Sequence, residues 1–308
     1  MRKTLNSLSV LIQELKYPDP EVIILTDRRD IFALRDFLKA EQRKFTVKIH
    51  RVWRKQEGMI KKADIDAIIE TRSLPQRTMD TWAEQIREFV TEEIIPAYQE
   101  AIGISGGQMA RRINRRRKQA FEFDSASTNA LVWMNEQGGK LIVQLTKAQY
   151  ETIHALLTNQ VFMGITSPYQ LGQMLKPLVG LTAREAIAAL RLQTGLIEAG
   201  LPADLVANKT AKYREILHKR RASRIARTEL ADAYNFGQQH SIGQALDAGF
   251  VEGEVEKTWM AGGIDPCDIC LDNEAAGPIP LEEEFPSGDL HPTAHPQCEC
   301  SCGYQVRR

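Results

Sequence analysis

Hydrophobic residues recur at helical spacing along most of this chain. In the segment that begins at Asp30, apolar side chains occupy positions 31, 34, 37 and 38, and in the segment from Thr78 they occupy positions 82, 86, 89, 90 and 94. A period of about 3.6 residues is typical of amphipathic helices. Pro96 should end or kink the second helix, because proline removes a backbone donor. The pattern therefore predicts a mainly helical protein.

Short motifs predict where helices begin and end. The sequences T-K-A-Q at Thr146, S-P-Y-Q at Ser167 and T-A-R-E at Thr182 are each typical of a capped helix start. Glycines at 103, 106, 107, 138 and 139 predict turns. We place a domain boundary at the last of these turns. The expected organisation is a helical N-terminal region (1–140), a helical domain (141–250) and a C-terminal module (251–308).

The C-terminal module begins with a predicted strand from Glu254 to Trp259 and contains all five cysteines of the chain. Cys267 and Cys270 form a C-x2-C pair, and His295 and Cys298 follow as H-P-Q-C. Two such pairs supply four ligands, which is the number that a structural zinc ion takes in a tetrahedral site. The spacing therefore predicts structural zinc bound by these four residues.

Two cysteines exceed this count and leave the ligand set open. Residues two apart on an extended segment share a face, so Cys298, Cys300 and Cys302 can point the same way. Cys300 is therefore a further candidate ligand in place of Cys298 or His295. Disulfides and metal-free thiols are the alternatives, but a reducing cytoplasm favours metal. The expected fold is mainly α, a multi-helix elongated body with a small C-terminal α+β zinc-knuckle module.

Charge is balanced over the whole chain but unevenly distributed. Forty basic and forty acidic residues cancel in 308 residues. From Thr258 to Val306 there is no Lys or Arg, whereas the acidic residues there are Asp265, Asp268, Asp272, Glu274, Glu282, Glu283, Glu284, Asp289 and Glu299. Phosphate contacts supply much of the affinity of nucleic-acid-binding modules, so this acidic surface disfavours a DNA-reading zinc finger.

Basic residues concentrate in two helical segments. The first includes Arg112, Arg115 and Arg116, and the second includes Arg224 and Arg227. Each set recurs at three- or four-residue spacing and so shares a helix face. These arginines are candidate contacts for phosphate or an acidic partner, or else they form intramolecular ion pairs. One hypothesis is that the second basic helix docks on the acidic C-terminal module.

Two blocks of sequence resemble the phage Mu F-like head morphogenesis family, which comprises minor head proteins of tailed phages. The first block is R-A-S-R-I-A-R-T-E-L from Arg221, followed by Ala233, Asn235 and Gly237. The second is the C-x2-C pair followed by H-P-Q-C-E-C. The resemblance covers about residues 145–302. The family usually carries Arg where this chain has Glu299, so no anion-binding role is carried over to that position.

The resemblance implies a minor capsid protein that acts in procapsid assembly at or near the portal, and in packaging or delivery of the genome. The implied partners are the portal protein, the major capsid or scaffold protein, and phage DNA. The implied locations are the interior of the virion head and the host cytoplasm. Zinc would stabilise the C-terminal module, and no catalytic role is implied.

The residues themselves indicate no enzyme. The sequence has no Gly-rich phosphate loop, no Ser-His-Asp arrangement and no H-E-x-x-H motif. The alternative function is a zinc-dependent nuclease or a DNA-binding protein. No apolar run approaches the roughly 20 residues of a membrane span, so we expect no membrane partner. Polar residues interrupt the apolar N-terminus, which predicts a first helix and not a secretory signal.

Overall fold

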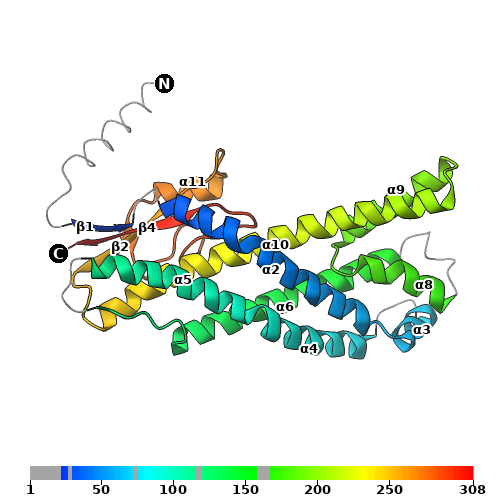
Figure 1. Cartoon of the computed structure of the whole chain (residues 1–308), viewed down its shortest axis with the longest axis horizontal. Coiled ribbons are helices and arrows are strands. Elements are labelled where there is room, and N and C mark those ends of the chain that lie inside the picture. Colours follow the sequence, from blue (N-terminus) through cyan, green and yellow to red (C-terminus); the bar gives the residue numbers. More distant parts are fainter. Residues whose placement is uncertain (1–21, 27–29, 72–74, 116–119, 158–166, 308) are drawn as a thin grey trace, which may run out of the picture. The chain divides into compact units, whose positions relative to one another are not determined.

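The structure is a computed structural model that describes residues 22–26, 30–71, 75–115, 120–157 and 167–307. The expected N-terminal helix lies outside these residues. The helices are α2 (Asp30–Met59), α3 (Lys62–Thr71), α4 (Gln76–Glu93), α5 (Ile95–Asn114), α6 (Thr128–Leu157), α8 (Pro168–Leu175), the short 3-10 helix η1 (Lys176–Leu178), α9 (Ala183–Glu198), α10 (Ala203–Asp247) and α11 (Asp268–Ala275). The strands are β1 (Val22–Thr26), β2 (Glu254–Met260), β3 (Ile279–Pro280) and β4 (Ser301–Arg307). The prediction of a mainly helical fold with a small C-terminal α+β module is confirmed (Figure 1).

The chain divides into two compact units. Unit 1 contains Met1–Leu38, Ala101–Ser125 and Ala231–Arg308, and unit 2 contains Lys39–Glu100 and Ala126–Leu230. These units interleave along the chain, whereas the domains expected from the sequence were contiguous. Helices α2, α5 and α10 contribute residues to both units. None of the described helices combines the length and the apolar character that a membrane crossing requires.

Unit 1 contains an antiparallel sheet with the strand order β1-β4-β2-β3. Strand β2 begins at Glu254, as predicted, and pairs with β4 along its whole length, from Glu254 opposite Arg307 to Met260 opposite Ser301. Strand β1 pairs with the other edge of β4. The end of the chain is therefore a central strand, held between a segment close to it in sequence and one near the beginning of the chain.

The core of unit 1 joins this sheet to the helices beside it (Figure 1). Strand β2 buries Val255, Lys257 and Trp259 on one face, as its alternation predicts. Trp259 packs edge-on against Phe285, with ring centroids 5.0 Å apart. The same cluster includes apolar residues of α5 and α10, namely Met109, Ala110, Ile113, Ile242 and Ala245. The C-terminal module thus shares its core with two long helices.

Unit 2 is a helical assembly in which α4 packs on α6, α6 on α9, and α3 on α8. Two predicted helix starts are confirmed: Ser167 caps α8, and Thr182 and Glu185 form a reciprocal capping box on α9. Helix α4 ends at Glu93, shortly before Pro96, also as predicted. These local signals succeed because the capping groups lie within four residues of one another.

Other predicted helix ends are wrong. Helix α6 runs without interruption through residues 138–139 and through Thr146, whose hydroxyl donates to the carbonyl of Ile142 inside the helix. The turn predicted at residues 103–107 lies within α5. At Gly106 and Gly138 the missing side chain allows close packing instead of a turn. A Cβ on Gly106 would lie 2.2 Å from the ring of Phe123, and one on Gly138 would lie 2.8 Å from Cδ1 of Ile95.

Gly237 and Gly243 provide a matched test of packing on α10. A Cβ on Gly237 would lie 2.2 Å from Oγ of Ser105 and 2.8 Å from the carbonyl oxygen of Ile102, whereas a Cβ on Gly243 would meet nothing within 4 Å. We expect Gly237→Ala to lower the free energy of unfolding by about 1–3 kcal/mol through overpacking. Gly243→Ala should raise it by about 0.5–1 kcal/mol, because alanine favours helix. Chemical denaturation of both variants measures the two signs, and equal effects would contradict this packing.

Candidate metal centre

The C-x2-C pair lies at the start of α11. Cys267 is the N-cap residue of this helix, and Cys270 lies three residues later in its first turn. The amide of Leu271 donates to the carbonyl of Cys267, which closes that turn. A cap residue and the third residue of a helix face each other, so the two thiols converge.

His295 approaches both thiols. Its Nε2 lies 3.2 Å from Sγ of Cys267 and 3.2 Å from Sγ of Cys270. Its Nδ1 lies 3.0 Å from the carbonyl oxygen of Pro296. When Nδ1 donates to that carbonyl, the lone pair of Nε2 points to the two sulfurs. This is the usual arrangement of a histidine that binds metal through Nε2.

Cys298 and Cys300 extend the cluster. The sulfurs of Cys270 and Cys298 are 3.7 Å apart. A tetrahedral ion with metal–sulfur bonds of about 2.3 Å would separate two sulfur ligands by about 3.8 Å. The ligand atoms form two groups, Cys267–Cys270–His295 and Cys270–Cys298–Cys300, and within each group all atoms lie within 4.8 Å of one another. These two groups could hold a metal ion, and Cys270 belongs to both.

Each of the five predicted ligands therefore belongs to at least one of these two groups, and the five cysteines are free thiols with no disulfide between them. The remaining cysteine and the remaining histidine of the C-terminal module lie outside both groups. Cys302 is fully buried in β4, opposite Trp259 of β2. Nδ1 of His291 lies 3.5 Å from a carboxylate oxygen of Asp232.

The thiols strongly influence one another's protonation. Hydrogen bonding from Cys298 is the main cause that lowers the pKa of Cys300 to about 6, and the amide of Gly262 also donates to its sulfur. Donation to Cys300 and burial raise the pKa of Cys298, and burial raises that of Cys270. The cluster thus favours one thiolate beside protonated neighbours. A divalent cation stabilises several adjacent thiolates at once, so this donor set suits a metal.

Lys257 of β2 is buried near the carboxylates of Glu282, Glu283 and Glu284, which we call the acidic loop. Lys257 is fully buried, and its Nζ donates to the carbonyl of Leu290 at 2.7 Å. Its Nζ also lies 5.3 Å from the ring centroid of Phe285. Burial lowers the pKa of Lys257, while Cys302 and the carboxylates at 282–284 act in the opposite direction. This single lysine partly balances the negative charge of the loop.

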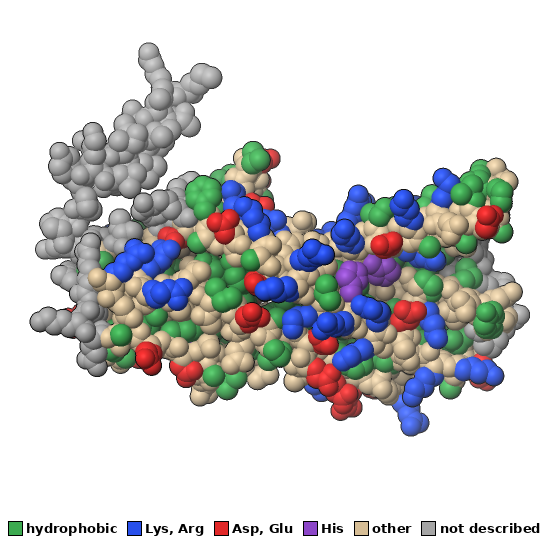
Figure 2. All heavy atoms as spheres, in the orientation of Figure 1, with side chains coloured by type: hydrophobic (Ala, Val, Ile, Leu, Met, Phe, Trp, Pro, Cys, Tyr) green, Lys and Arg blue, Asp and Glu red, His purple; other side chains and the backbone are tan. Residues whose placement is uncertain are grey.

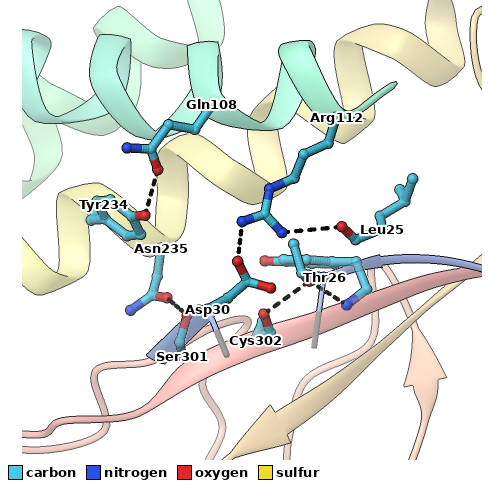
Figure 3. Close-up of polar contacts among 10 residues, drawn as sticks. Leu25, Thr26, Asp30, Gln108, Arg112, Tyr234, Asn235, Ser301 and Cys302 are labelled. Atoms are coloured by element: carbon cyan, nitrogen blue, oxygen red, sulfur yellow. Dashed lines mark hydrogen bonds and ion pairs between the residues drawn. The ribbon is translucent and has the colours of Figure 1, made fainter. Parts of the chain in front are cut away.

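Asn235 of α10 connects that helix directly to the cysteine segment. Its side-chain amide donates to the carbonyl oxygen of Cys300 at 3.3 Å and to that of Ala231 at 3.0 Å. Its side-chain oxygen accepts from Oγ of Ser301 at 3.0 Å (Figure 3). Asn235 and Ser301 are fully buried. The helix therefore fixes the backbone that carries one of the candidate ligands.

Two further residues, Thr26 and Arg112, hold β1 against the same region (Figure 3). Oγ1 of Thr26 donates to the carbonyl of Cys302 and accepts from the amide of Tyr304 at 2.8 Å. Arg112 of α5 donates to the carbonyl of Leu25 at 3.2 Å and pairs with Asp30. Residues near the beginning of the chain thus support the strand that follows the cysteines.

The arginines that the sequence indicates as phosphate or partner contacts occupy different environments. Arg112 makes the internal contacts just described, and Arg115 is exposed. Arg224 pairs with Glu185 at 3.2 Å within unit 2, and Arg227 is half-buried. Arg116 lies outside the described residues. Contact of these arginines with phosphate or a partner stays a prediction.

Sequence reasoning did not assign a role to Asn235 or to the pairing of Glu299. Glu299 lies between two candidate ligands and pairs with Arg35 of α2 at 3.3 Å. The sequence around Asn235 indicated a specific role for this residue. It is a polar residue among the small residues Ala231, Ala233 and Gly237, which is unusual on a buried helix face. The sequence around Arg35 gave no such indication, because nothing near it in the chain relates it to Glu299.

In comparisons with known proteins, the chain matches no family model, no curated protein and no solved structure.

Proposed function

We propose that the cluster binds one zinc ion in a structural site, with Cys267, Cys270, His295 and Cys298 as ligands. The support is the donor set, which combines sulfur and imidazole nitrogen. The spacing of 3.7 Å between Cys270 and Cys298 also fits a tetrahedral edge. Cys300 would remain a hydrogen-bonded neighbour whose sulfur accepts from Gly262. When bound, zinc supplies folding free energy to the C-terminal module.

Paired cysteine variants test this ligand assignment. We expect Cys298→Ser to lose zinc and Cys300→Ser to retain about one ion per chain with weaker affinity, because only the first removes a ligand. Elemental analysis of the purified full chain and competition with a chelator measure content and affinity. The reverse ranking would assign the fourth position to Cys300. Wild-type protein that is metal-free after isolation and takes up no zinc would refute the site.

We further propose that the protein is a phage minor head protein that acts in procapsid assembly at or near the portal. One observation carries this proposal: the two sequence blocks that resemble the Mu F-like family meet in space. Asn235 of the helical block holds the backbone of Cys300 and the side chain of Ser301 in the cysteine block. Two motifs joined by buried hydrogen bonds are expected of one functional unit.

Further residues of the helical block also make specific contacts. Gly237 allows close approach of α5, and Arg221 donates to the carbonyl of Gly180. Burial lowers the pKa of Arg221 to about 10, and Glu185 acts in the opposite direction. Glu229 accepts from the hydroxyl of Tyr98. The block thus has structural contacts along its length, which suits an assembly protein more readily than an exposed catalytic site.

The proposal implies the portal protein, the major capsid or scaffold protein and phage DNA as partners. It also implies residence in the head interior and, before assembly, in the host cytoplasm. Coexpression with the portal, scaffold and major capsid proteins of the same genome tests it. We expect the tagged chain to sediment with procapsids in a few copies per particle and to copurify with the portal. Procapsids that form in its presence but exclude it would refute the proposal.

The alternative, a zinc-dependent nuclease or DNA-binding protein, gives a different result. Purified protein would then cleave plasmid DNA with magnesium or manganese, or retain duplex DNA in a manner that weakens steeply with salt. The minor head proposal expects no cleavage. Cleavage that disappears in a Cys270→Ser variant would favour the nuclease instead.

A further inference from the structure

The first half of α10 presents an exposed basic face in unit 2. On a helix, residues 205, 209, 212, 216, 219 and 220 fall within one arc of the surface. We call this face the α10 stripe, and it consists of Leu205, Lys209, Lys212, Ile216, Lys219 and Arg220, all of them exposed. Among the described residues, none forms an ion pair with the four cations of the stripe. Figure 2 shows Lys and Arg side chains distributed over the region of α9 and α10.

The stripe also contains exposed apolar side chains. Leu205 and Ile216 are each 40% exposed, and Ile216 lies between Lys212 and Lys219. Phosphate groups would satisfy the lysines but would leave these aliphatic side chains in water. A protein surface that is both acidic and apolar would satisfy the two kinds of side chain together. The stripe therefore favours a protein partner over nucleic acid.

Such a surface exists on the C-terminal module of unit 1. We call it the α11 patch, and it consists of Ile264, Asp265, Asp268, Ile269, Leu271 and Asp272, all of them exposed. The side chain of Ile264 is fully exposed, and Ile269 and Leu271 are 48% and 44% exposed. No Lys or Arg occurs between Thr258 and Val306. An exposed apolar group surrounded by charge is typical of an interaction site.

We propose that the α11 patch of one copy binds the α10 stripe of a second copy. The two surfaces match in sign of charge, and both carry exposed aliphatic side chains. Because the surfaces are different, the contact is heterologous, and each copy of a pair keeps one free stripe or one free patch. Further copies can then add head to tail. This goes beyond the proposed function, which names other proteins as partners, and does not depend on it.

Three variants separate the surfaces. The stripe variant carries Lys209→Glu, Lys212→Glu and Lys219→Glu. The patch variant carries Asp265→Lys and Asp272→Lys, which avoid the metal-binding residues and the first turn of α11. A second patch variant, Ile264→Ser with Ile269→Ser, leaves the charge unchanged. A control with the same charge change as the stripe variant elsewhere in unit 2 carries Lys61→Glu, Arg87→Glu and Lys140→Glu, at three exposed positions.

Sedimentation velocity of the full chain is the measurement, with zinc content and circular dichroism to verify folding. We expect wild type and control to form oligomers at low salt that dissociate as salt screens the charges. Each stripe or patch variant should weaken association by roughly tenfold or more. An equimolar mixture of the stripe variant and the Ile264→Ser, Ile269→Ser patch variant should form a 1:1 heterodimer that grows no further, because only one intact contact remains and the acidic patch repels the mutated stripe.

Several outcomes would overturn the proposal. Wild type that is monomeric at every concentration and salt would do so, as would a mixture in which the two variants fail to associate. Variants that associate as well as wild type would also exclude these surfaces. If the stripe variant lost retention of duplex DNA and kept wild-type self-association, the stripe would bind nucleic acid instead.

Discussion

Replacing Cys270 with serine should remove the bound ion and unfold the C-terminal module. Cys270 is the thiol that the two groups of candidate ligands share, so its loss disrupts both. In small zinc domains the ion contributes about 10–16 kcal/mol of folding free energy, and serine is a poor substitute for a thiolate. We expect the purified variant to contain no zinc and to lose strand signal in circular dichroism.

Chymotrypsin gives a direct readout of this unfolding. Trypsin is uninformative because no Lys or Arg lies between Thr258 and Val306. Chymotrypsin cleaves after aromatic residues, and Trp259, Phe285 and Tyr304 are at most 2% exposed. These sites should resist cleavage in the wild type and become accessible in the variant. Chelator treatment of the wild type should reproduce the same fragments.

Cys302→Ala is the matched control. Cys302 is buried in the same segment, and burial raises its pKa to about 12, but it belongs to neither ligand group. Its replacement should cost some packing energy and leave zinc content unchanged. If Cys270→Ser retained zinc with wild-type affinity, or if Cys302→Ala lost it, the ligand cluster would be incorrectly assigned.

The candidate ligands could be found from the sequence because their geometry is largely local. Cys267 and Cys270 converge within the first turn of α11, and the amide of Cys298 donates to the carbonyl of His295 in a turn of its own. Each pair is therefore determined by residues three apart. Only the approach of one pair to the other depends on the fold. It could be predicted from the sequence because both pairs consist of residues that bind the same kind of metal.

The glycines and Thr146 show where local reasoning fails. Because glycine has no side chain, it can either form a turn or let another segment pack closely against it. The local sequence does not distinguish these two roles. Gly106 faces Phe123 and Gly138 faces Ile95, so the deciding contacts come from other segments of their units. Thr146 has the right neighbours for a cap, but its hydroxyl bonds within a continuous helix. Tertiary packing outweighs the local signal at these positions.

The sheet was predicted only in part, for a related reason. Strand β2 shows the alternation of a half-buried strand, whereas β1 must be matched with β4 across nearly the whole chain. The bond from the amide of Tyr304 to Thr26 depends on this pairing. No periodicity relates two segments at such separation. The division into interleaved units follows from the same long-range contacts and was therefore not expected.

Replacing Asn235 with alanine should weaken metal binding, because Asn235 connects α10 to the segment that carries the cysteines. The variant would leave the carbonyl of Cys300 and the hydroxyl of Ser301 without their buried partner. An unsatisfied buried polar group costs about 1–3 kcal/mol. We expect the free energy of unfolding to fall by about 2–4 kcal/mol. Groups that orient a ligand typically change metal affinity by 10- to 100-fold, so chelator competition should show a loss of about that size.

Asn208→Ala, on the exposed surface of the same helix, is the control and should change stability by no more than about 0.5 kcal/mol. Asn235→Asp separates the two hydrogen bonds, because it can still accept from Ser301 but cannot donate to the carbonyl of Cys300. If the bond to Cys300 orients the site, the aspartate variant should lose metal affinity much as the alanine variant does. Lower stability with wild-type affinity in both variants would instead mean that Asn235 serves the fold alone, and that α10 does not control the geometry of the cysteine cluster.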